Sequence, residues 1–233
     1  MKLLIVSDIH ANYEALKRLD SIEADYDHLI FLGDAVDYGP QPKRCIDFIK
    51  KRAYRAVRGN HDNALAYNTD CGCSSKYKHL SLETRRYNRM LLDNEDISYL
   101  AGLPLTDRFA LGDSSFLMTH ASPKGDLYRY LYPQMSDDAW GSEIDGIDAG
   151  FVLLGHIHIP FVKKIGTTTI INPGSAGQPR DGDPKGSYAI WENGVVIIKR
   201  FSYDIDKTIG EIERSGMEEE IVKGLSVILR RGA

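Results

Sequence analysis

Histidine, aspartate and asparagine side chains recur in this chain directly after short apolar runs. The residues with this placement are Asp8, His10, Asp34, Asn60, His61, His120, His156 and His158. Gly155 gives the backbone the freedom to leave the last run, so that His156 and His158 can face one volume. A single histidine of this kind is usually structural, but five of the seven histidines together indicate a metal centre. Its nitrogen and oxygen ligands suit Mn²⁺, Fe²⁺, Zn²⁺ or Ni²⁺.

The apolar runs predict parallel strands joined by helices. Buried strands are expected at 2–6, 29–32, 54–57, 115–119 and 151–154. Helical spacing of apolar residues predicts helices near 13–22 and 42–51. Because crossover connections align the carboxyl ends of parallel strands along one sheet edge, the polar loops should converge there. Asp37 lies in one of these loops, although an aspartate at this place is also a common helix cap.

The second half of the chain predicts antiparallel strands and C-terminal helices. Strands are expected at 161–165, 168–171, 187–191 and 195–198, with the turn Glu192-Asn193-Gly194 joining the last two. An amphipathic helix or helix pair is expected from about 206 to 231. Residues 63–110 carry two helical patterns and are interpreted as a helical cap inserted within a single domain, 1–233.

Composition narrows the classes of function. The chain is 42% apolar and 27% charged with a net charge of −4, which argues against a stable nucleic-acid complex but permits a small phosphate-bearing substrate. Its apolar runs are too short for a membrane span or a signal peptide, so we expect a cytoplasmic protein with no membrane association. Three cysteines without a secretory signal predict no disulfide framework. Cys71 and Cys73 are interpreted as reduced loop thiols, with a soft-metal site as the alternative, and a homodimer stays open.

The motifs resemble those of the calcineurin-like metallophosphoesterases, in particular small bacterial and archaeal phosphodiesterases and phosphatases. The family pattern is DxH, GDxxDxG, GNH(D/E), a later strand-end histidine and GHxH. The matching segments are Asp8–His10, Gly33–Gly39, Gly59–Asp62, His120 and Gly155–His158. The resemblance implies an α/β fold, a four-layer αββα sandwich of two mixed β-sheets flanked by helices. We expect the first three strands in one sheet and the C-terminal hairpin in the other.

The resemblance also implies two divalent ions, Mn²⁺ first, with Fe²⁺, Zn²⁺ and Ni²⁺ as alternatives. One ion would be held by Asp8, His10 and His158, the other by Asn60, His120 and His156, with Asp34 bridging them. A hydroxide on the metals would attack phosphorus, and His61, oriented by Asp37, would protonate the leaving oxygen. Arg58 and Arg180 are candidate phosphate contacts, and bracing of the ligand loop is the alternative role for Arg58.

The substrate class is narrowed by two departures from the phosphoprotein-phosphatase branch. Tyr38 stands where that branch has arginine, and Asp62 stands where it has glutamate. Loss of the arginine removes a planar phosphate clamp, so we expect a phosphodiesterase acting on a small phosphate ester. Because His61 stands where small phosphodiesterase-like members often carry cysteine, monoester hydrolysis stays open. A phosphomonoesterase for small nucleotides or a protein phosphatase is the alternative, and a non-catalytic binding module of the same fold is less favoured.

The segment 128–132 interleaves tyrosines with Arg129 and Leu131. Such a pattern is compatible with a base-stacking surface. Because alternate residues of an extended segment face opposite sides, packing beneath the helical cap is the preferred interpretation.

Overall fold

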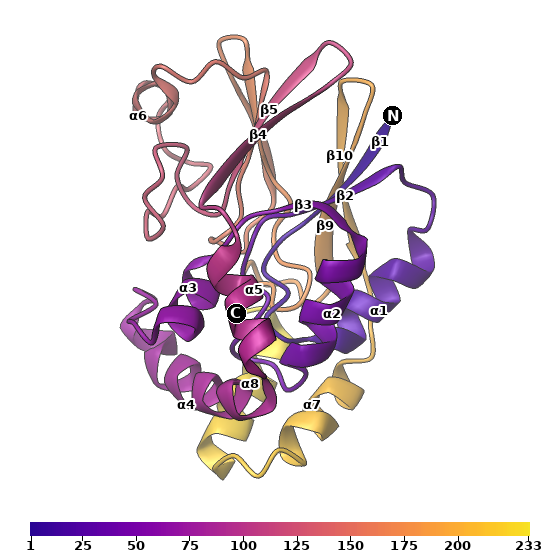
Figure 1. Ribbon diagram of the computed structural model, residues 1–233, viewed down its shortest axis with the longest axis vertical. Coiled ribbons are helices and arrows are strands. Elements are labelled where there is room, and N and C mark those ends of the chain that lie inside the picture. The colour runs from indigo at the N-terminus through magenta and orange to yellow at the C-terminus, as the bar shows by residue number, and fades with distance from the viewer.

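A computed structural model describes residues 1–233 (Figure 1). The strands are β1 (Lys2–Val6), β2 (His28–Phe31), β3 (Ala53–Ala56), β4 (Thr106–Leu111), β5 (Ser114–Thr119), β6 (Phe151–Leu153), β7 (Phe161–Ile165), β8 (Thr168–Asn172), β9 (Gly186–Glu192) and β10 (Val195–Phe201). The helices are α1 (Tyr13–Ile22), α2 (Pro42–Arg52), α3 (Asn60–Tyr67), α4 (Ser75–Leu91), α5 (Asn94–Gly102), α6 (Asp137–Ile144), α7 (Ile205–Glu213) and α8 (Glu219–Arg231).

Two mixed five-stranded sheets form the centre of the molecule. Their strand orders are β10-β9-β1-β2-β3 and β4-β5-β6-β8-β7. The parallel arrangement of β1, β2 and β3 is confirmed. In the second sheet β6 lies between β5 and β8 and is parallel to both. Figure 1 shows α3, α4, α5, α7 and α8 gathered at the end of the sheets opposite the N-terminus.

The C-terminal hairpin does not belong to the second sheet, so that expectation is wrong. β9 pairs antiparallel with β1, placing Ile190 opposite Leu4, and β10 follows as the edge strand. The reason lies in the side chains of β9, which are buried on both faces. Ile190 packs on the helix side of the sheet, whereas Trp191 packs between the two sheets. A strand apolar on both faces needs a covered position, and the free edge of β1 provides one.

The sheets and helices make four layers, as expected. Apolar side chains of both sheets meet between them, among them Ile5, Ile30, Phe116 and Leu153. Figure 1 shows α1 and α2 beside the first sheet and α6 on the outer side of the second. Trp140 of α6 is fully buried in the cluster on that outer side. The fold is therefore an αββα sandwich.

Three elements were missing from the sequence-based expectations: β4, α3 and α6. β4 pairs antiparallel with β5 and begins within the stretch 63–110. α3 begins at Asn60, so Asn60 and His61 belong to the first turn of a helix rather than to a loop. The remainder of 63–110 contains α4 and α5, and α5 packs against α3.

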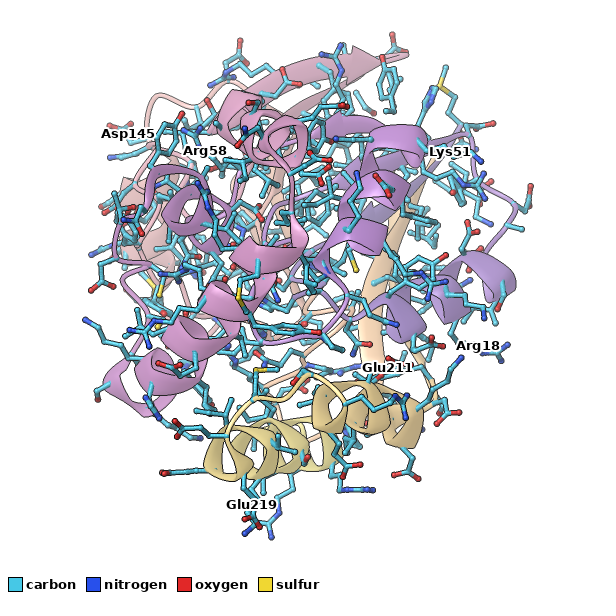
Figure 2. The ribbon with its side chains drawn as sticks, turned by 60° about the horizontal axis from the view of Figure 1, so that its bottom comes forward. Arg18, Lys51, Arg58, Asp145, Glu211 and Glu219 are labelled. Carbon is cyan, nitrogen blue, oxygen red and sulfur yellow. The ribbon has the colours of Figure 1, made fainter.

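The chain ends in the expected amphipathic helix pair. α7 and α8 pack on each other through Ile209, Ile212, Ile221 and Leu225. Figure 2 shows charged side chains such as Glu219 of α8 projecting away from the molecule. No helix combines the length and the hydrophobicity that a membrane crossing requires.

Glu23 ties three strands to α1, and its ion pairs predict acid sensitivity. Its carboxylate accepts hydrogen bonds from Lys2 Nζ at 2.9 Å, Lys199 Nζ at 2.8 Å and the Tyr188 hydroxyl at 2.9 Å. Burial opposes ionisation, but these contacts outweigh it and lower the pKa of Glu23 from 4.5 to about 2. A carboxyl group whose pKa is lowered by folding stabilises the protein above its unfolded pKa and loses this effect as the pH falls towards the folded pKa.

We expect Glu23→Gln to lower the free energy of unfolding by about 1–3 kcal/mol at pH 7. The difference from wild type should shrink as the pH falls from 4.5 to about 2. Urea unfolding followed by circular dichroism over this range measures it, with the exposed Glu213→Gln as the control. A difference that stays constant with pH would contradict the assignment.

Candidate metal centre

The polar side chains predicted at strand ends converge in space. Asp8, Asp34 and the first turn of α3 follow β1, β2 and β3, while His120, His156 and His158 follow β5 and β6. All of these side chains are at least 96% buried. Because the contributing strands are parallel within each sheet, the carboxyl ends of both sheets deliver their loops to one site.

The first cluster consists of Asp8, His10 and His158, whose ligand atoms lie within 4.8 Å of one another. His10 Nε2 is 3.1 Å from His158 Nε2. His158 Nε2 is 3.4 Å from Asp8 Oδ1, a buried oxygen without a hydrogen-bond partner. Three potential ligand atoms therefore face a common point without satisfying one another.

The second cluster consists of Asp34, His120 and His156, joined by Asn60. Asn60 Oδ1 lies 3.0 Å from His120 Nε2 and 3.0 Å from His156 Nδ1. The amide nitrogen of Asn60 donates to the Cys71 carbonyl at 2.7 Å, which turns the amide oxygen towards the histidines. This cluster therefore adds a neutral oxygen to the carboxylate and the two imidazoles.

Asp34 lies between the two clusters. Its Oδ2 is 3.2 Å from His120 Nε2 and 3.8 Å from His10 Nε2. Its other oxygen accepts a hydrogen bond from the backbone amide of His61 at 2.9 Å. One carboxylate oxygen is thus fixed by the protein, while the other faces both histidine clusters.

Three of the four cluster histidines are oriented by backbone carbonyls. Nδ1 donates to Val36 O at 2.9 Å in His10, to Leu32 O at 2.7 Å in His120 and to Gln178 O at 2.5 Å in His158. This second contact is the one that metal-binding histidines usually make, because it turns the opposite nitrogen towards the ion. In neutral His10 and His158 it leaves two bare Nε2 lone pairs facing each other. A cation between them removes that repulsion, so the residues fit a metal ion.

The protonation of the histidines agrees with this fit. Burial lowers the pKa of His10, His156 and His158 well below the usual value, so these rings are neutral, as metal binding requires. For His120, burial is outweighed by the charge of Asp34, which raises the pKa to about 9. An ion at this cluster would replace that proton, since metal binding releases protons from its ligands.

His61 lies beside the clusters and is held by a carboxylate. Its Nδ1 is 2.7 Å from Asp37 Oδ2, and its ring centre is 5.1 Å from that of His10. Burial lowers its pKa, but the charge of Asp34 and the contact with Asp37 more than compensate, so the pKa is raised. Asp37 does not cap the following helix, because the N-cap of α2 is Gln41. The pairing of His61 with Asp37 is therefore confirmed in the structure.

Helix α4 supplies a buried polar face that the sequence analysis missed. It consists of Ser81, Thr84, Arg85 and Asn88. Arg85 donates to Asp37 Oδ2 from Nε at 3.0 Å and from Nη2 at 2.7 Å. Asn88 Oδ1 accepts from the Asp37 amide at 2.9 Å. The helix thereby fixes the residue that holds His61.

The spacing of these four residues in the sequence could have predicted that they share one face of a helix. They recur at i, i+3, i+4 and i+7, the period of one helix face. The apolar residues Leu82 and Met90 of the same helix are instead 41% and 77% exposed. The buried face of α4 is therefore its polar face, and the helical spacing of these polar residues marks it in the sequence.

Asp62 is a further residue whose role was missed. Its carboxylate accepts backbone hydrogen bonds from Asp34 at 2.8 Å, Ala35 at 2.8 Å and Gly59 at 3.0 Å. It joins the loop after β2 to the start of α3 and so positions two ligand-bearing segments. The sequence feature that could have indicated this role is the position of Asp62 as the last residue of the motif Gly59–Asp62.

The two arginines expected at the phosphate differ in position. Arg58 Nη1 donates to Ala101 O at 2.5 Å and to the Tyr67 hydroxyl at 3.1 Å, so it braces α5 against α3 and is not brought into the clusters. These contacts favour the alternative role of Arg58, which is to brace the segment that carries the ligand Asn60. Arg180 lies over the ring of Tyr77 at 4.1 Å and over that of Tyr38 at 5.3 Å. Because Tyr38 packs edge-on against His10 at 4.9 Å, Arg180 stands at the border of the site.

The Cys71-Gly72-Cys73 loop also borders the site. The two Sγ atoms lie 3.0 Å apart, and Cys71 Sγ is 3.4 Å from Ser81 Oγ. Both cysteines are buried and unbridged. Through its carbonyl, Cys71 orients Asn60 as described above.

The backbone is unusual at the site. Ten non-glycine residues have positive φ, and eight of them lie in the ligand loops, with φ between 49° and 72°. These eight are Asp8, His10, Ala11, Asp34, Asp37, Tyr38, His156 and His158. Left-handed backbone costs roughly 1–3 kcal/mol at a non-glycine residue and concentrates at functional sites.

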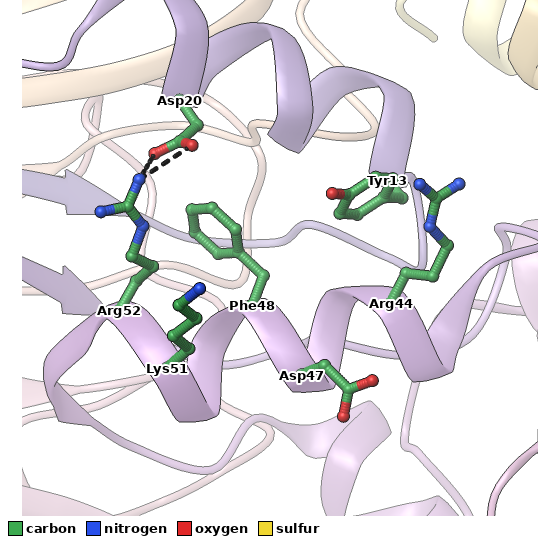
Figure 3. Close-up of a pocket in the computed structure, with 7 residues that line it drawn as sticks. All are labelled: Tyr13, Asp20, Arg44, Asp47, Phe48, Lys51 and Arg52. Carbon is green, nitrogen blue, oxygen red and sulfur yellow. Dashed lines mark hydrogen bonds and ion pairs between the residues drawn. The ribbon is translucent and has the colours of Figure 1, made fainter.

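A separate cavity of about 480 Å³ lies between α1 and α2 (Figure 3). Two of the three cations that line it are engaged, because Arg52 bonds Asp20 at 2.8 Å and Arg44 stacks on Tyr13 at 3.9 Å. None of the cluster residues lines it. This cavity is therefore separate from the metal clusters at the strand ends.

Comparisons with known proteins agree with this geometry. A family model described as the calcineurin-like phosphoesterase superfamily domain matches residues 1–193. The uncharacterized protein MJ0912 of Methanocaldococcus jannaschii is 30% identical over 237 residues, which cover 93% of this chain and 94% of that protein. Phosphodiesterase YfcE of Escherichia coli is 24% identical over 212 residues, covering 85% and 91%. The crystal structure of a metallophosphoesterase from Sphaerobacter thermophilus is 30% identical, covers 100% of this chain and 99% of its own, and superimposes with a TM-score of 0.82.

Proposed function

Since the chain belongs to the calcineurin-like phosphoesterase superfamily, we propose that it is a phosphodiesterase that works with two divalent metal ions. The observation that carries the proposal is the position of Asp34 Oδ2, which faces His120 at 3.2 Å and His10 at 3.8 Å. An oxygen shared in this way between two histidine clusters suits a bridging ligand. A small phosphate ester is the proposed substrate.

We assign the metal ligands according to the two clusters of side chains described above. One ion would be held by Asp8, His10 and His158, the other by Asn60, His120 and His156, and Asp34 would bridge them. The two carboxylates remove two of the four positive charges, and the remaining charge attracts the anionic substrate. Mn²⁺ is our first assignment. The mixed nitrogen and oxygen ligand set also accepts other divalent ions, so Fe²⁺, Zn²⁺ and Ni²⁺ are the alternatives.

Bound ions would polarise a phosphate oxygen and lower the pKa of a water molecule enough for it to serve as the nucleophile. The chain's own task is then to hold the ester and to assist departure of the alcohol. His61 is placed to donate a proton to the leaving oxygen, because Asp37 holds its Nδ1 at 2.7 Å and leaves Nε2 free. Arg85 in turn fixes Asp37 with two hydrogen bonds.

A diester suits the charge at the border of the site. Tyr38 occupies the place of an arginine clamp, and its ring packs against His10 and His61. Arg180 is then the cation beside the clusters, which suits a singly charged diester better than a doubly charged monoester. A phosphomonoesterase is the second candidate, because the paired His61 provides the acid that a monoester with a poor leaving group needs.

The proposal is tested with bis-p-nitrophenyl phosphate and p-nitrophenyl phosphate. Chelator-treated protein should lose nearly all turnover, and Mn²⁺ should restore it, because the proposed nucleophile is a water molecule whose pKa the ions would lower. Faster release of p-nitrophenol from the diester than from the monoester is expected. Turnover that survives chelation, or no turnover with Mn²⁺, Ni²⁺, Zn²⁺ or Fe²⁺, would contradict the hydrolase proposal.

A further inference from the structure

A cleft of about 410 Å³ opens beside the metal clusters. It is lined by Ser74, Tyr77, Tyr130, Tyr132, Ile157, Ile159 and Arg180. Ile157 stands between the cluster residues His156 and His158, and the ring of Tyr130 lies 4.2 Å from that of His156. A substrate whose phosphate reached the clusters would therefore extend its organic group into this cleft. Its volume is that of a small-molecule pocket, about 300–1,000 Å³.

One wall of the cleft is a stack of aromatic rings. The ring of Tyr130 is tilted by 44° against that of His156, and Tyr132 stacks on Tyr130 with ring centres 6.2 Å apart at an interplanar angle of 17°. A planar group inserted between two rings needs a separation of about 7 Å, so nothing inserts between these two. Tyr132 is 37% exposed and offers the accessible outer part of the stack.

The lining of the cleft also combines an aromatic ring with a cation. Tyr77 of α4 carries the guanidinium of Arg180 at 4.1 Å from its ring centre. Arg180 Nη2 donates to Gln178, but its Nε is buried without a hydrogen-bond partner. Arg180 therefore has a spare donor for an anionic oxygen between the clusters and the cleft.

The segment 128–132 packs in part as expected, but beside Trp140 of α6 rather than beneath the helical cap. Leu131 is 2% exposed and packs on the outer face of the second sheet, whereas Tyr130 and Tyr132 line the cleft. The alternation of an extended segment thus sends the leucine into the core and two tyrosines to the site.

We propose that the cleft binds the base of a nucleoside phosphate, with the flat heterocycle stacked on Tyr132 and the phosphate held by Arg180 and the metal clusters. This inference rests on the proposed function and names its substrate class. The cleft has aromatic faces for stacking, and the Ser74 and tyrosine hydroxyls provide polar contacts for the edge of a base. It has no carboxylate and a single cation, which suits a neutral base joined to an anionic phosphate.

The test compares two ligands that differ only by the base: adenosine 5′-monophosphate and ribose 5-phosphate. Binding is measured by isothermal titration calorimetry with Mn²⁺ in the His61→Gln protein, so that the ligand is not consumed. Because both ligands share the sugar and the phosphate, any effect of the substitution at His61 cancels in the ratio of their dissociation constants. Stacking is worth about 1–3 kcal/mol per base, so the adenosine ligand should bind about 5- to 150-fold more tightly.

Matched variants separate the two halves of the site. Tyr132→Ala should bring this ratio close to 1 by weakening the adenosine ligand alone, and Tyr132→Phe should keep it. Tyr132 makes its hydrogen bonds through its backbone carbonyl, which accepts from Trp140 Nε1 and from the Met135 amide, so the alanine variant retains both contacts. Arg180→Gln should weaken both ligands together.

Three results would overturn the nucleotide proposal. These are equal binding of the two ligands by the starting protein, a ratio unaffected by Tyr132→Ala, and binding of phenyl phosphate as tight as that of the adenosine ligand. The last would indicate a general aryl pocket. Absence of ester hydrolysis by the wild type with the base-dependent ratio intact would overturn the hydrolase proposal alone, so the two failures are distinguishable.

Discussion

Asp34→Asn should lower kcat/KM for bis-p-nitrophenyl phosphate by about 10³-fold or more. Changes to residues that only orient metal ligands already cost about 10–100-fold, and Asp34 is the side chain shared by both clusters. The substitution keeps the size of the side chain but removes one of its two oxygens. Since the backbone amide of His61 requires an acceptor at Oδ1, the new NH₂ group must take the place of Oδ2. A donor at that place repels a cation instead of binding it.

The metal content of this variant, measured by inductively coupled plasma mass spectrometry, should fall below that of the wild type. Asp145→Asn serves as the matched control, because Asp145 is exposed at the end of α6, away from the clusters. Activity within tenfold of the wild type, with full metal content, would show that Asp34 does not bridge the ions.

His61→Gln should lower kcat by about 10²–10⁴-fold, the usual contribution of a general acid, while KM changes little. The loss should depend on the leaving group. p-Nitrophenolate leaves readily without a proton, whereas an alkoxide does not. A diester with an alkyl leaving group should therefore lose more activity than bis-p-nitrophenyl phosphate. Initial rates across a series of leaving groups measure this dependence.

His79→Gln is the control for this variant, since His79 is an exposed histidine of α4. Asp37→Asn should reproduce part of the effect, because Asp37 holds the ring of His61 at 2.7 Å. An equal loss for every leaving group, accompanied by loss of metal, would instead make His61 a structural or metal-holding residue.

The metal clusters could be predicted because their signal is local in sequence. Each ligand follows an apolar strand, and the parallel connection of β1, β2 and β3 brings such loops together without further information. His156 and His158 carry the same signal after β6. Pairing of His61 with Asp37 followed from their motifs. The strands with the clearest apolar patterns and the C-terminal helix pair were predicted for the same reason.

The remaining features depend on contacts distant in sequence. The hairpin β9–β10 was predicted as an element. Its turn sequence, however, does not determine which strand pairs with β9, which in the structure is β1. Arg85 was missed because α4 buries a polar face, which is favourable only where Asp37 lies opposite. The choice between the two roles of Arg58 was left open because adjacency in sequence to Asn60 does not fix the direction of a long side chain, which here reaches Ala101.

The left-handed backbone of the ligand loops has a consequence for laboratory evolution. Eight non-glycine residues hold this conformation where the metal would bind, and His10 and His158 also bring two bare nitrogens within 3.1 Å. A selection that rewarded survival of heating without requiring turnover would replace such residues first. Asparagine and glycine adopt left-handed backbone at lower cost than histidine. The heat-resistant survivors would keep the sandwich and lose its chemistry, as expected where stability and activity oppose each other.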